Sequence, residues 1–149
     1  MLRPTEDPIA FRFFNEIGII EQLARTQLER NLPDGLKMPQ FGVLNHLARL
    51  EGDWSPARLA SAFQVTKGAM NNTLQRLEKR GLVRVIPDPH DGRAKLVSIT
   101  NTGRDMRLRC VDSVSPLLTE LLQALSDKEF ASALPFLEKV RIYLDGHRS

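Results

Sequence analysis

Between residues 66 and 80 the sequence arranges carboxamide and cationic side chains along one face of an expected helix. Apolar residues recur at helical spacing as Met70, Leu74 and Leu77, so that side faces a core. The opposite side carries Thr66, Lys67, Gly68, Asn71, Asn72, Gln75, Arg76 and Lys79. Asn and Gln can bond adenine at two points, and Lys and Arg suit phosphates or guanine. Glu78 adds the only carboxylate, near the far end, whereas an ordinary solvated helix mixes in acidic residues throughout.

The residues before and after this segment are those needed to hold it as the second member of a helix pair. Ser55 followed by proline predicts a capped start for a short helix over 56–63, which Trp54 begins as a packing anchor. A tight turn leads to Thr66, which caps the next helix, and Gly81 ends that helix in the left-handed conformation. This spacing predicts a helix-turn-helix whose second helix enters a major groove. Ser55 is counted with the candidate DNA contacts.

After the helix pair the apolar period changes from 3.6 to 2, which indicates a β-hairpin. Its expected parts are a strand at 82–86, a turn-rich tip at 87–93 and a returning strand at 95–99. Arg93 lies near the tip, Arg84 and Lys95 flank it on the strands, and Asp91 is expected to hold Arg93 by an ion pair. A basic tip suits a minor groove, where the potential is most negative.

The fold class predicted is mainly α with a small two-stranded β wing, an α+β winged helix-turn-helix flanked by long terminal helices. A helix over 9–32 is apolar on more than one side, and another over 102–125 contains Pro116. Thr100 or Thr102 caps that helix, and Ser126 opens a final helix with a capping box. A monomer of this size could not easily cover so much apolar helix surface, so the pattern favours a homodimer.

The length fits one domain over 1–149. The middle of this domain is basic. Within it, 9–35 and 102–146 are expected to be dimerisation helices and 37–100 the DNA-binding winged helix. Residues 55–104 hold nine Lys/Arg against three Asp/Glu, although the whole chain carries only +3. A surface for a polyanion is one interpretation of this clustering, and an ordinary solvated face is the other.

Several classes of protein are not indicated by the composition. No run of eighteen apolar residues and no leader pattern occur, so we expect a cytoplasmic protein that does not enter a membrane. The sequence has one cysteine, Cys110, and three scattered histidines. We therefore expect no intrachain disulfide and no metal site. No catalytic motif is found, so we expect no enzyme activity and no cofactor.

The stretch SPARLASAFQVTKGAMNNTLQRLEKRGLVRVIPDPHDGRAKLVSITNTG resembles the winged helix-turn-helix of the MarR family. The matching features are an LA pair separated by five residues from a Thr, the LEKRGLV junction, the DPHDGRAKLVSIT wing and the TNTG entry to the next helix. Asp91 and Arg93 match the Asp-x-Arg element of that family's wing, whereas Gly92 stands where members often carry another basic residue. The long flanking helices extend the resemblance over nearly the whole chain.

The resemblance implies a homodimer built from the terminal helices and bound to a palindromic operator in double-stranded DNA. Recognition helices would lie in successive major grooves and wings in the minor groove. It further implies a repressor that blocks its promoter by occupancy and is released by a small aromatic effector. The alternative is a winged helix used for protein–protein contact without specific DNA binding, because a fold does not fix a function.

Overall fold

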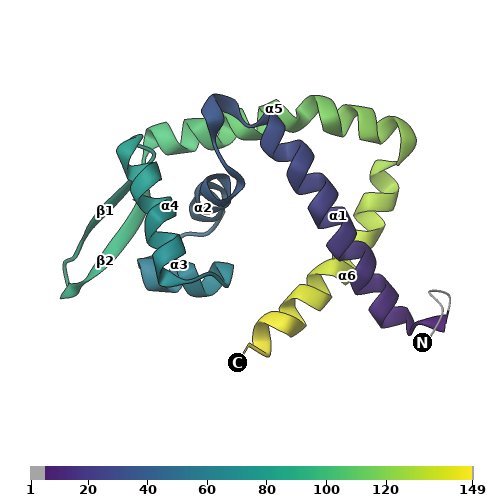
Figure 1. The fold of residues 1–149 in the computed structure, drawn as a ribbon, viewed down its shortest axis with the longest axis horizontal. Helices are drawn as coiled ribbons and strands as arrows, with labels where there is room; N and C mark the ends of the chain where they lie inside the picture. Colours follow the sequence, from purple (N-terminus) through teal and green to yellow (C-terminus); the bar gives the residue numbers. More distant parts are fainter. Residues whose placement is uncertain (1–5, 149) are drawn as a thin grey trace. The chain divides into compact units, whose positions relative to one another are not determined.

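The computed structural model describes residues 6–148. Its helices and strands are α1 (Ile9–Asn31), the short 3-10 turn η2 (Pro33–Gly35), α2 (Met38–Arg49), α3 (Pro56–Phe63), α4 (Lys67–Lys79), β1 (Val83–Asp88), β2 (Asp91–Ile99), α5 (Asn101–Ala124) and α6 (Asp127–Gly146) (Figure 1). Within this part of the chain two compact units divide between Ser113 and Val114, inside α5. The predicted fold class, mainly helical with a two-stranded wing, is confirmed.

Local capping fixes the helix pair α3–α4 as the sequence predicted. Ser55 Oγ accepts a hydrogen bond from the backbone N–H of Arg58 at 3.0 Å, and Thr66 Oγ1 accepts from that of Ala69 at 3.1 Å. Between the helices Gln64 takes the left-handed conformation with φ 54°, which reverses the chain in a three-residue turn. Each helix start thus has a backbone donor satisfied locally, which stabilises the pair in addition to its core packing.

One hydrophobic core joins this pair to α2, the hairpin and the first turns of α5. Fifteen buried apolar residues form it, namely Leu32, Leu36, Val43, Leu44, Leu47, Leu59, Ala60, Met70, Leu74, Leu77, Leu82, Val83, Val97, Met106 and Cys110. Their spacing on α4 is the one predicted, and it leaves the opposite face of that helix in solvent. Burial of each Leu side chain contributes roughly 2–3 kcal/mol, so the core holds α4 rigidly.

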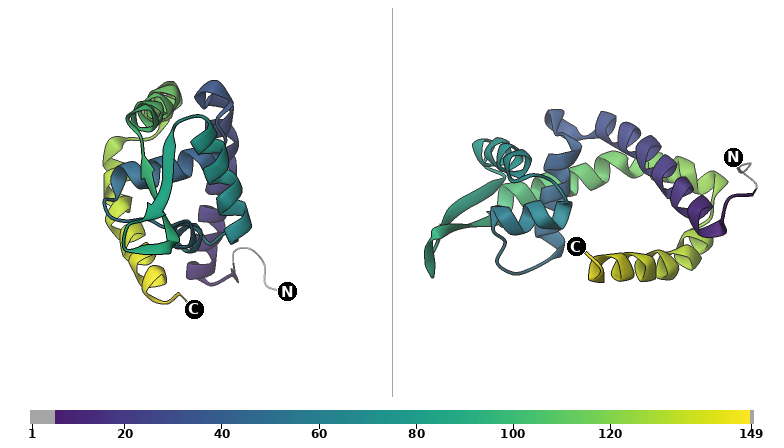
Figure 2. Two further views of the ribbon diagram at one scale, coloured as in Figure 1. Left: turned by 90° about the vertical axis from the view of Figure 1, so that its left-hand side faces the viewer. Right: turned by 60° about the horizontal axis from the view of Figure 1, so that its bottom comes forward.

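The hairpin is longer than the sequence predicted. Its strands pair from Val83 opposite Ile99 to Asp88 opposite Asp91, with an irregularity between Pro87 and Asp88. The expected seven-residue tip is therefore wrong, because most of it belongs to the strands and only two residues turn. Proline is tolerated here because it lies at an irregular step of a two-stranded sheet, where no regular ladder bond is lost. Figure 2 shows the hairpin projecting beyond the helices α2–α4.

Trp54 does not begin α3 as expected but lies in an extended segment before it. Its carbonyl accepts a hydrogen bond from the backbone N–H of Val97 at 2.7 Å, which forms an isolated antiparallel bridge to β2. The chain between α2 and α3 is thereby fastened to the base of the wing. Pairing over so long a sequence separation leaves no local signal, which is why the sequence did not show it.

The two long C-terminal helices begin at side-chain caps. Thr100 Oγ1 accepts from the backbone N–H of Gly103 at 3.0 Å, so Thr100 caps α5 and Thr102 lies inside the helix. The predicted capping box at α6 is confirmed, since Ser126 and Glu129 exchange hydrogen bonds of 3.2 and 3.1 Å. Pro116 falls within α5, as the sequence indicates.

Two helices contribute nothing to the core of the chain. All residues of α1 and α6 are described, and neither helix has a buried residue. Over 6–148, no helix is long and apolar enough to cross a membrane.

A close approach of backbones at the start of α5 predicts a stability defect. A methyl group added at Gly103 would overlap the carbonyl oxygen of Leu82 and come within 2.8 Å of Ile99 Cγ1. We expect Gly103→Ala to lower the free energy of unfolding by about 1–3 kcal/mol, because the backbone cannot yield as a flexible side chain would. Urea unfolding followed by circular dichroism measures the change. Gly146→Ala, which meets no neighbour within 4 Å, is the matched control, and equal stability of the two variants would contradict the prediction.

Candidate nucleic-acid interface

The outward face of α4 presents every polar residue that the sequence singled out there. Thr66, Lys67, Gly68, Asn71, Asn72, Gln75, Arg76 and Lys79 are all exposed, whereas Met70, Leu74 and Leu77 are buried beneath them. The first turn of α4 contains no acidic residue. A helix N-terminus with cationic neighbours and no carboxylate attracts anions, because its free N–H groups carry partial positive charge.

Glu78, the one carboxylate of this helix, does not belong to that polar face. Its Oε2 accepts a hydrogen bond from the backbone N–H of Val85 at 3.0 Å, so the side chain is directed to the wing. The negative charge is thus used to fasten α4 to β1. The exposed polar face of α4 is left with carboxamide, hydroxyl and cationic groups only.

The two asparagines of the polar face differ in their side-chain hydrogen bonds. Asn72 Oδ1 lies 3.4 Å from Arg76 Nε, one turn further along the helix, and this weak bond orients both side chains. Asn71 makes no side-chain hydrogen bond within residues 6–148. Asn71 is therefore available to bond a base edge directly, whereas Asn72 also positions a cation.

The basic residues of the wing are exposed, but the expected ion pair at its tip is absent. Asp91 Oδ1 accepts from the backbone N–H of Arg93 at 3.0 Å, and among the described residues no carboxylate pairs with the Arg93 guanidinium. A short acidic side chain here closes a local turn in place of a salt bridge. Arg84 and Lys95 are exposed as well, on the strands that carry the tip.

Ser55, counted among the candidate DNA contacts, precedes α3 and is half-buried. Its hydroxyl is already engaged as the α3 cap. Next to it, the Arg58 guanidinium stacks 4.2 Å from the ring centre of Trp54 and donates to the carbonyl of Asp53 at 2.7 Å. The start of α3 is therefore a fixed point, held by capping, cation–π and hydrogen-bond contacts.

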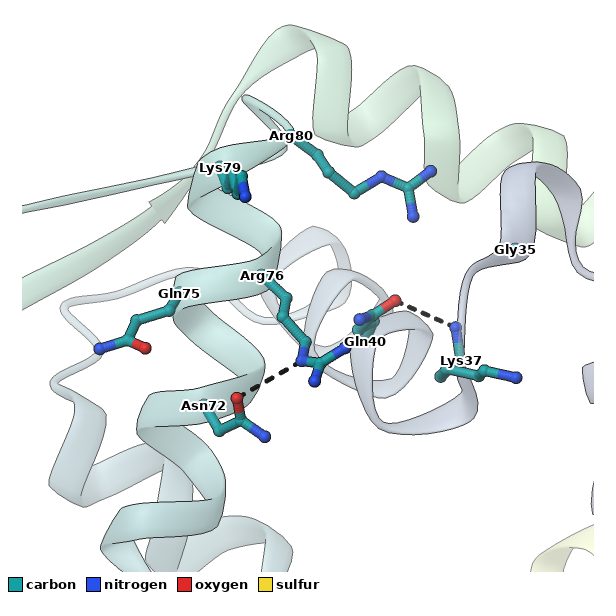
Figure 3. Close-up of a pocket in the computed structure, with 8 residues that line it drawn as sticks. All are labelled: Gly35, Lys37, Gln40, Asn72, Gln75, Arg76, Lys79 and Arg80. Carbon is teal, nitrogen blue, oxygen red and sulfur yellow. Dashed lines mark hydrogen bonds between the residues drawn. The ribbon is translucent and has the colours of Figure 1, made fainter.

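A groove of about 510 Å³ runs between the second half of α4 and the start of α2. It is lined by Gly35, Lys37, Gln40, Asn72, Gln75, Arg76, Lys79 and Arg80 (Figure 3). Lys37, Gln40 and Arg80 were not singled out from the sequence, since Lys37 precedes α4 by thirty residues. The only feature of the sequence that could have indicated part of this lining is the surplus of Lys and Arg around α4.

An ion pair ties the loop before α2 to α5 beside this groove. Arg109 Nη1 lies 2.9 Å from Asp34 Oδ2, and Arg80 donates to the backbone carbonyl of Asp34 at 3.1 Å. The hydrogen bond and charge of Arg109 lower the pKa of Asp34, and Asp34 in turn raises that of Arg109. Asp34 is thus the point where the end of α4 and α5 meet.

The remaining titratable groups favour a structural role. Cys110 is buried, and burial raises the pKa of its thiol, which disfavours the reactive thiolate. His46 packs edge-on against Trp54 with ring centres 4.2 Å apart, and burial lowers its pKa. No cluster of potential metal ligands occurs over residues 6–148.

Comparison with known proteins identifies the family. A model described as the MarR family matches residues 34–94. The chain is 31% identical to the multiple antibiotic resistance protein MarR of Escherichia coli K12, over 85% of this chain and 94% of that protein. It is 30% identical to the transcriptional regulator HosA of Escherichia coli O111:H-, over 78% and 84% of the two chains.

The chain belongs to the MarR family. Its structure resembles that of a MarR mutant from E. coli complexed with operator DNA, with a TM-score of 0.70 and 30% identity over 87% of this chain and 93% of that one. The match spans the winged helix and the long helices alike. MarR-family relatives are transcriptional regulators and not enzymes.

Burial of His46 predicts a dependence of stability on pH. The folded state favours the neutral His46 ring. The contribution of this ring to stability is therefore fully present above the unfolded pKa near 6.5, and it is lost as the pH falls through the lowered folded pKa. We expect the wild-type protein to lose more stability between pH 7.5 and pH 5.0 than His46→Gln does. Urea unfolding at both pH values measures this difference. The exposed His90→Gln should behave as wild type, and identical losses in all three proteins would refute the assignment.

Proposed function

We propose that this MarR-family protein is a sequence-specific DNA-binding repressor that acts as a homodimer on a palindromic operator. The observation that carries the proposal is the exposed polar face of α4, whose only acidic neighbour, Glu78, is bonded to the wing. A protein-binding surface has no need to exclude carboxylates, whereas a surface for phosphates does. The structural relative bound to operator DNA supports the same assignment.

In the proposed complex α4 lies in the major groove and the wing in the minor groove. Asn71, Asn72 and Gln75 read base edges, while Lys67, Arg76 and Lys79 contact phosphates or guanine. Thr66 and Gly68 allow close approach of the helix start, and Ser55 contacts the backbone beside it. Arg93 enters the minor groove, supported by Asp91, with Arg84 and Lys95 along the flanking strands.

The terminal helices support the homodimer. Their exposed large apolar residues include Ile9, Phe11, Ile20 and Leu23 on α1 and Leu134, Phe136, Ile142 and Tyr143 on α6. Apolar surface on this scale marks a protein interface. We assign 9–35 and 102–146 to dimerisation and 37–100 to DNA binding, within one domain over 1–149. A two-fold dimer places its recognition helices on two half-sites one helical turn apart.

Regulation follows from occupancy of the promoter. A dimer bound across it blocks transcription, and an effector releases it by favouring a half-site spacing that does not match the operator. We propose a small aromatic compound as the effector. Action on chromosomal DNA places the protein in the cytoplasm.

Single substitutions on α4 and the wing should separate base reading from general affinity. We expect Asn71→Ala to cost about 1–3 kcal/mol against the preferred sequence, because a bidentate contact to adenine is lost. Asn72→Ala should relax preference as well and also free Arg76. Arg93→Ala should weaken binding while α4 still reads its bases. Competition binding against operators with single base changes measures each effect. Unchanged preference in both asparagine variants would mean that another face of α4 meets DNA.

Fluorescence anisotropy with duplex DNA from the protein's own upstream region tests the function as a whole. We expect tight binding to this duplex, weaker binding to a scrambled duplex and a steep dependence on salt. Equal weak binding to both duplexes would leave only a basic surface. No binding at low salt would favour the alternative of a winged helix that contacts a protein partner.

The dimer makes a separate prediction. We expect the wild-type protein to sediment at twice its chain mass of 16.8 kDa. Leu23→Glu and Phe136→Glu should shift it toward the monomer, because each places a charge on the exposed apolar surface of a terminal helix. Lys139→Glu, which introduces the same charge at an exposed polar position of α6, is the control. A wild-type monomer at micromolar concentration would contradict the assignment of these helices.

A further inference from the structure

We infer that the groove between the start of α2 and the second half of α4 binds a phosphate of the DNA backbone, with Lys37 and Arg80 as positioning residues outside the base-reading face. The inference rests on the proposed function. It adds a phosphate contact from the start of α2. The position of α4 on the DNA would then be fixed by this contact as well as by the wing.

The lining of the groove is cationic. Lys37, Arg76, Lys79 and Arg80 line it together with the neutral groups Gln40, Asn72 and Gln75, and no carboxylate is part of the lining. Figure 3 shows Arg76 extending across toward Gln40, whereas Gln75 points away from α2. Arg76, Lys79 and Arg80 bring three positive charges to one opening, and these repel one another unless an anion lies between them. Figure 3 shows the Lys37 side chain directed away from α4, so its ammonium lies at the outer edge of the groove.

Three of these cations, Arg76, Lys79 and Arg80, form no ion pair with a carboxylate within residues 6–148. Within residues 6–148, Arg76 has only its weak bond to Asn72, and Lys79 has no hydrogen bond or ion pair. Arg80 donates to a backbone carbonyl, that of Asp34. A carbonyl orients a guanidinium without neutralising it. The nearby Asp34 carboxylate also attracts Arg80, but its ion pair is with Arg109, so Arg80 keeps a positive charge beside the groove.

Lys37 differs because a carboxylate competes for it. Its ammonium lies 3.8 Å from Glu29 Oε1, at the end of α1, and both side chains are exposed to solvent. Glu29 Oε2 meanwhile accepts from the backbone N–H of Met38 at 3.0 Å, so the carboxylate is anchored at the start of α2. An exposed pair at this distance is weak, so a phosphate oxygen that approaches more closely can compete with Glu29 for the flexible Lys37 side chain.

The backbone that carries Lys37 is firmly placed. Gln40 is buried, and its Oε1 accepts from the backbone N–H of Lys37 at 3.0 Å (Figure 3). The rim of the groove is therefore fixed by a buried side chain, while the ammonium at its edge is exposed to solvent. This combination suits a contact that must form only once α4 has docked.

The shape of the site favours a phosphate of a polymer over a free anion. The groove is open to solvent, and the cations around it are exposed, so a small anion would gain little by leaving water. A helix in the major groove, however, runs between two phosphate backbones, and one of them must pass along the side of α4. Asn72, Gln75 and Arg76 belong both to the groove and to the base-reading face, so the two surfaces are continuous.

The test compares three variants of the full-length protein on the upstream duplex and on its scramble. We expect Lys37→Gln to weaken binding to both duplexes by the same factor, about three- to tenfold, and to lower the salt slope by about one for each subunit in contact. Glu29→Gln should strengthen binding to both duplexes. Its carboxamide oxygen can still accept from Met38, while the competing charge is gone. Arg49→Gln, at the other end of α2, is the matched control and should leave affinity and slope unchanged.

The outcomes separate this inference from the proposed function. If the wild-type protein fails to distinguish the two duplexes, the proposed function is overturned. If it distinguishes them but Lys37→Gln matches Arg49→Gln in affinity and slope, only the groove assignment is overturned. A change of base preference in Lys37→Gln would also overturn it. Inorganic phosphate at constant ionic strength should not compete through Lys37, and competition lost in Lys37→Gln would show a free-anion site.

Discussion

The meeting of α4, the wing and α5 at one threonine is the constraint on which the rest of the structure depends. Thr100 donates from Oγ1 to the carbonyl of Gly81 at 2.6 Å, and its backbone N–H donates to the carbonyl of Leu82 at 3.1 Å. The same hydroxyl caps α5 against Gly103. These bonds, and the close packing that leaves no space for a side chain at Gly103, join the end of α4, the base of the wing and the first turn of α5.

The distribution of charge follows from what the acidic side chains bond. Glu78 accepts from the backbone of β1, and Asp88 and Asp91 accept from backbone N–H groups at the hairpin tip. Asp34 pairs with Arg109 of α5. Glu78, Asp88 and Asp91 thereby stabilise a turn or junction and form no ion pair with a cation within residues 6–148, whereas Asp34 neutralises Arg109. The net charge of +3 is thus unevenly distributed, because residues 55–104 hold nine Lys/Arg against three Asp/Glu.

Features fixed by neighbours in sequence could be predicted, and features fixed by distant segments could not. The caps at Ser55, Thr66 and Ser126 follow from residue types within one turn of helix. The bridge from Trp54 to Val97 and the groove lined by Lys37 and Arg80 join residues about forty positions apart, so no local pattern marks them. The DNA contacts themselves stay predictions, although the structure places those of α4 on one exposed face of that helix.

Because Cys110 is buried, chemical modification of its thiol reports on the packing of α5 against the winged helix. It is the only thiol of the chain, and it lies in the core beside the residues that join α5 to α2 and α4. An alkylating reagent can reach it only when this part of the core opens, because a buried, protonated thiol is unreactive. The rate of modification in the native protein therefore measures how often α5 separates from the winged helix, and any ligand that tightens the junction would slow it.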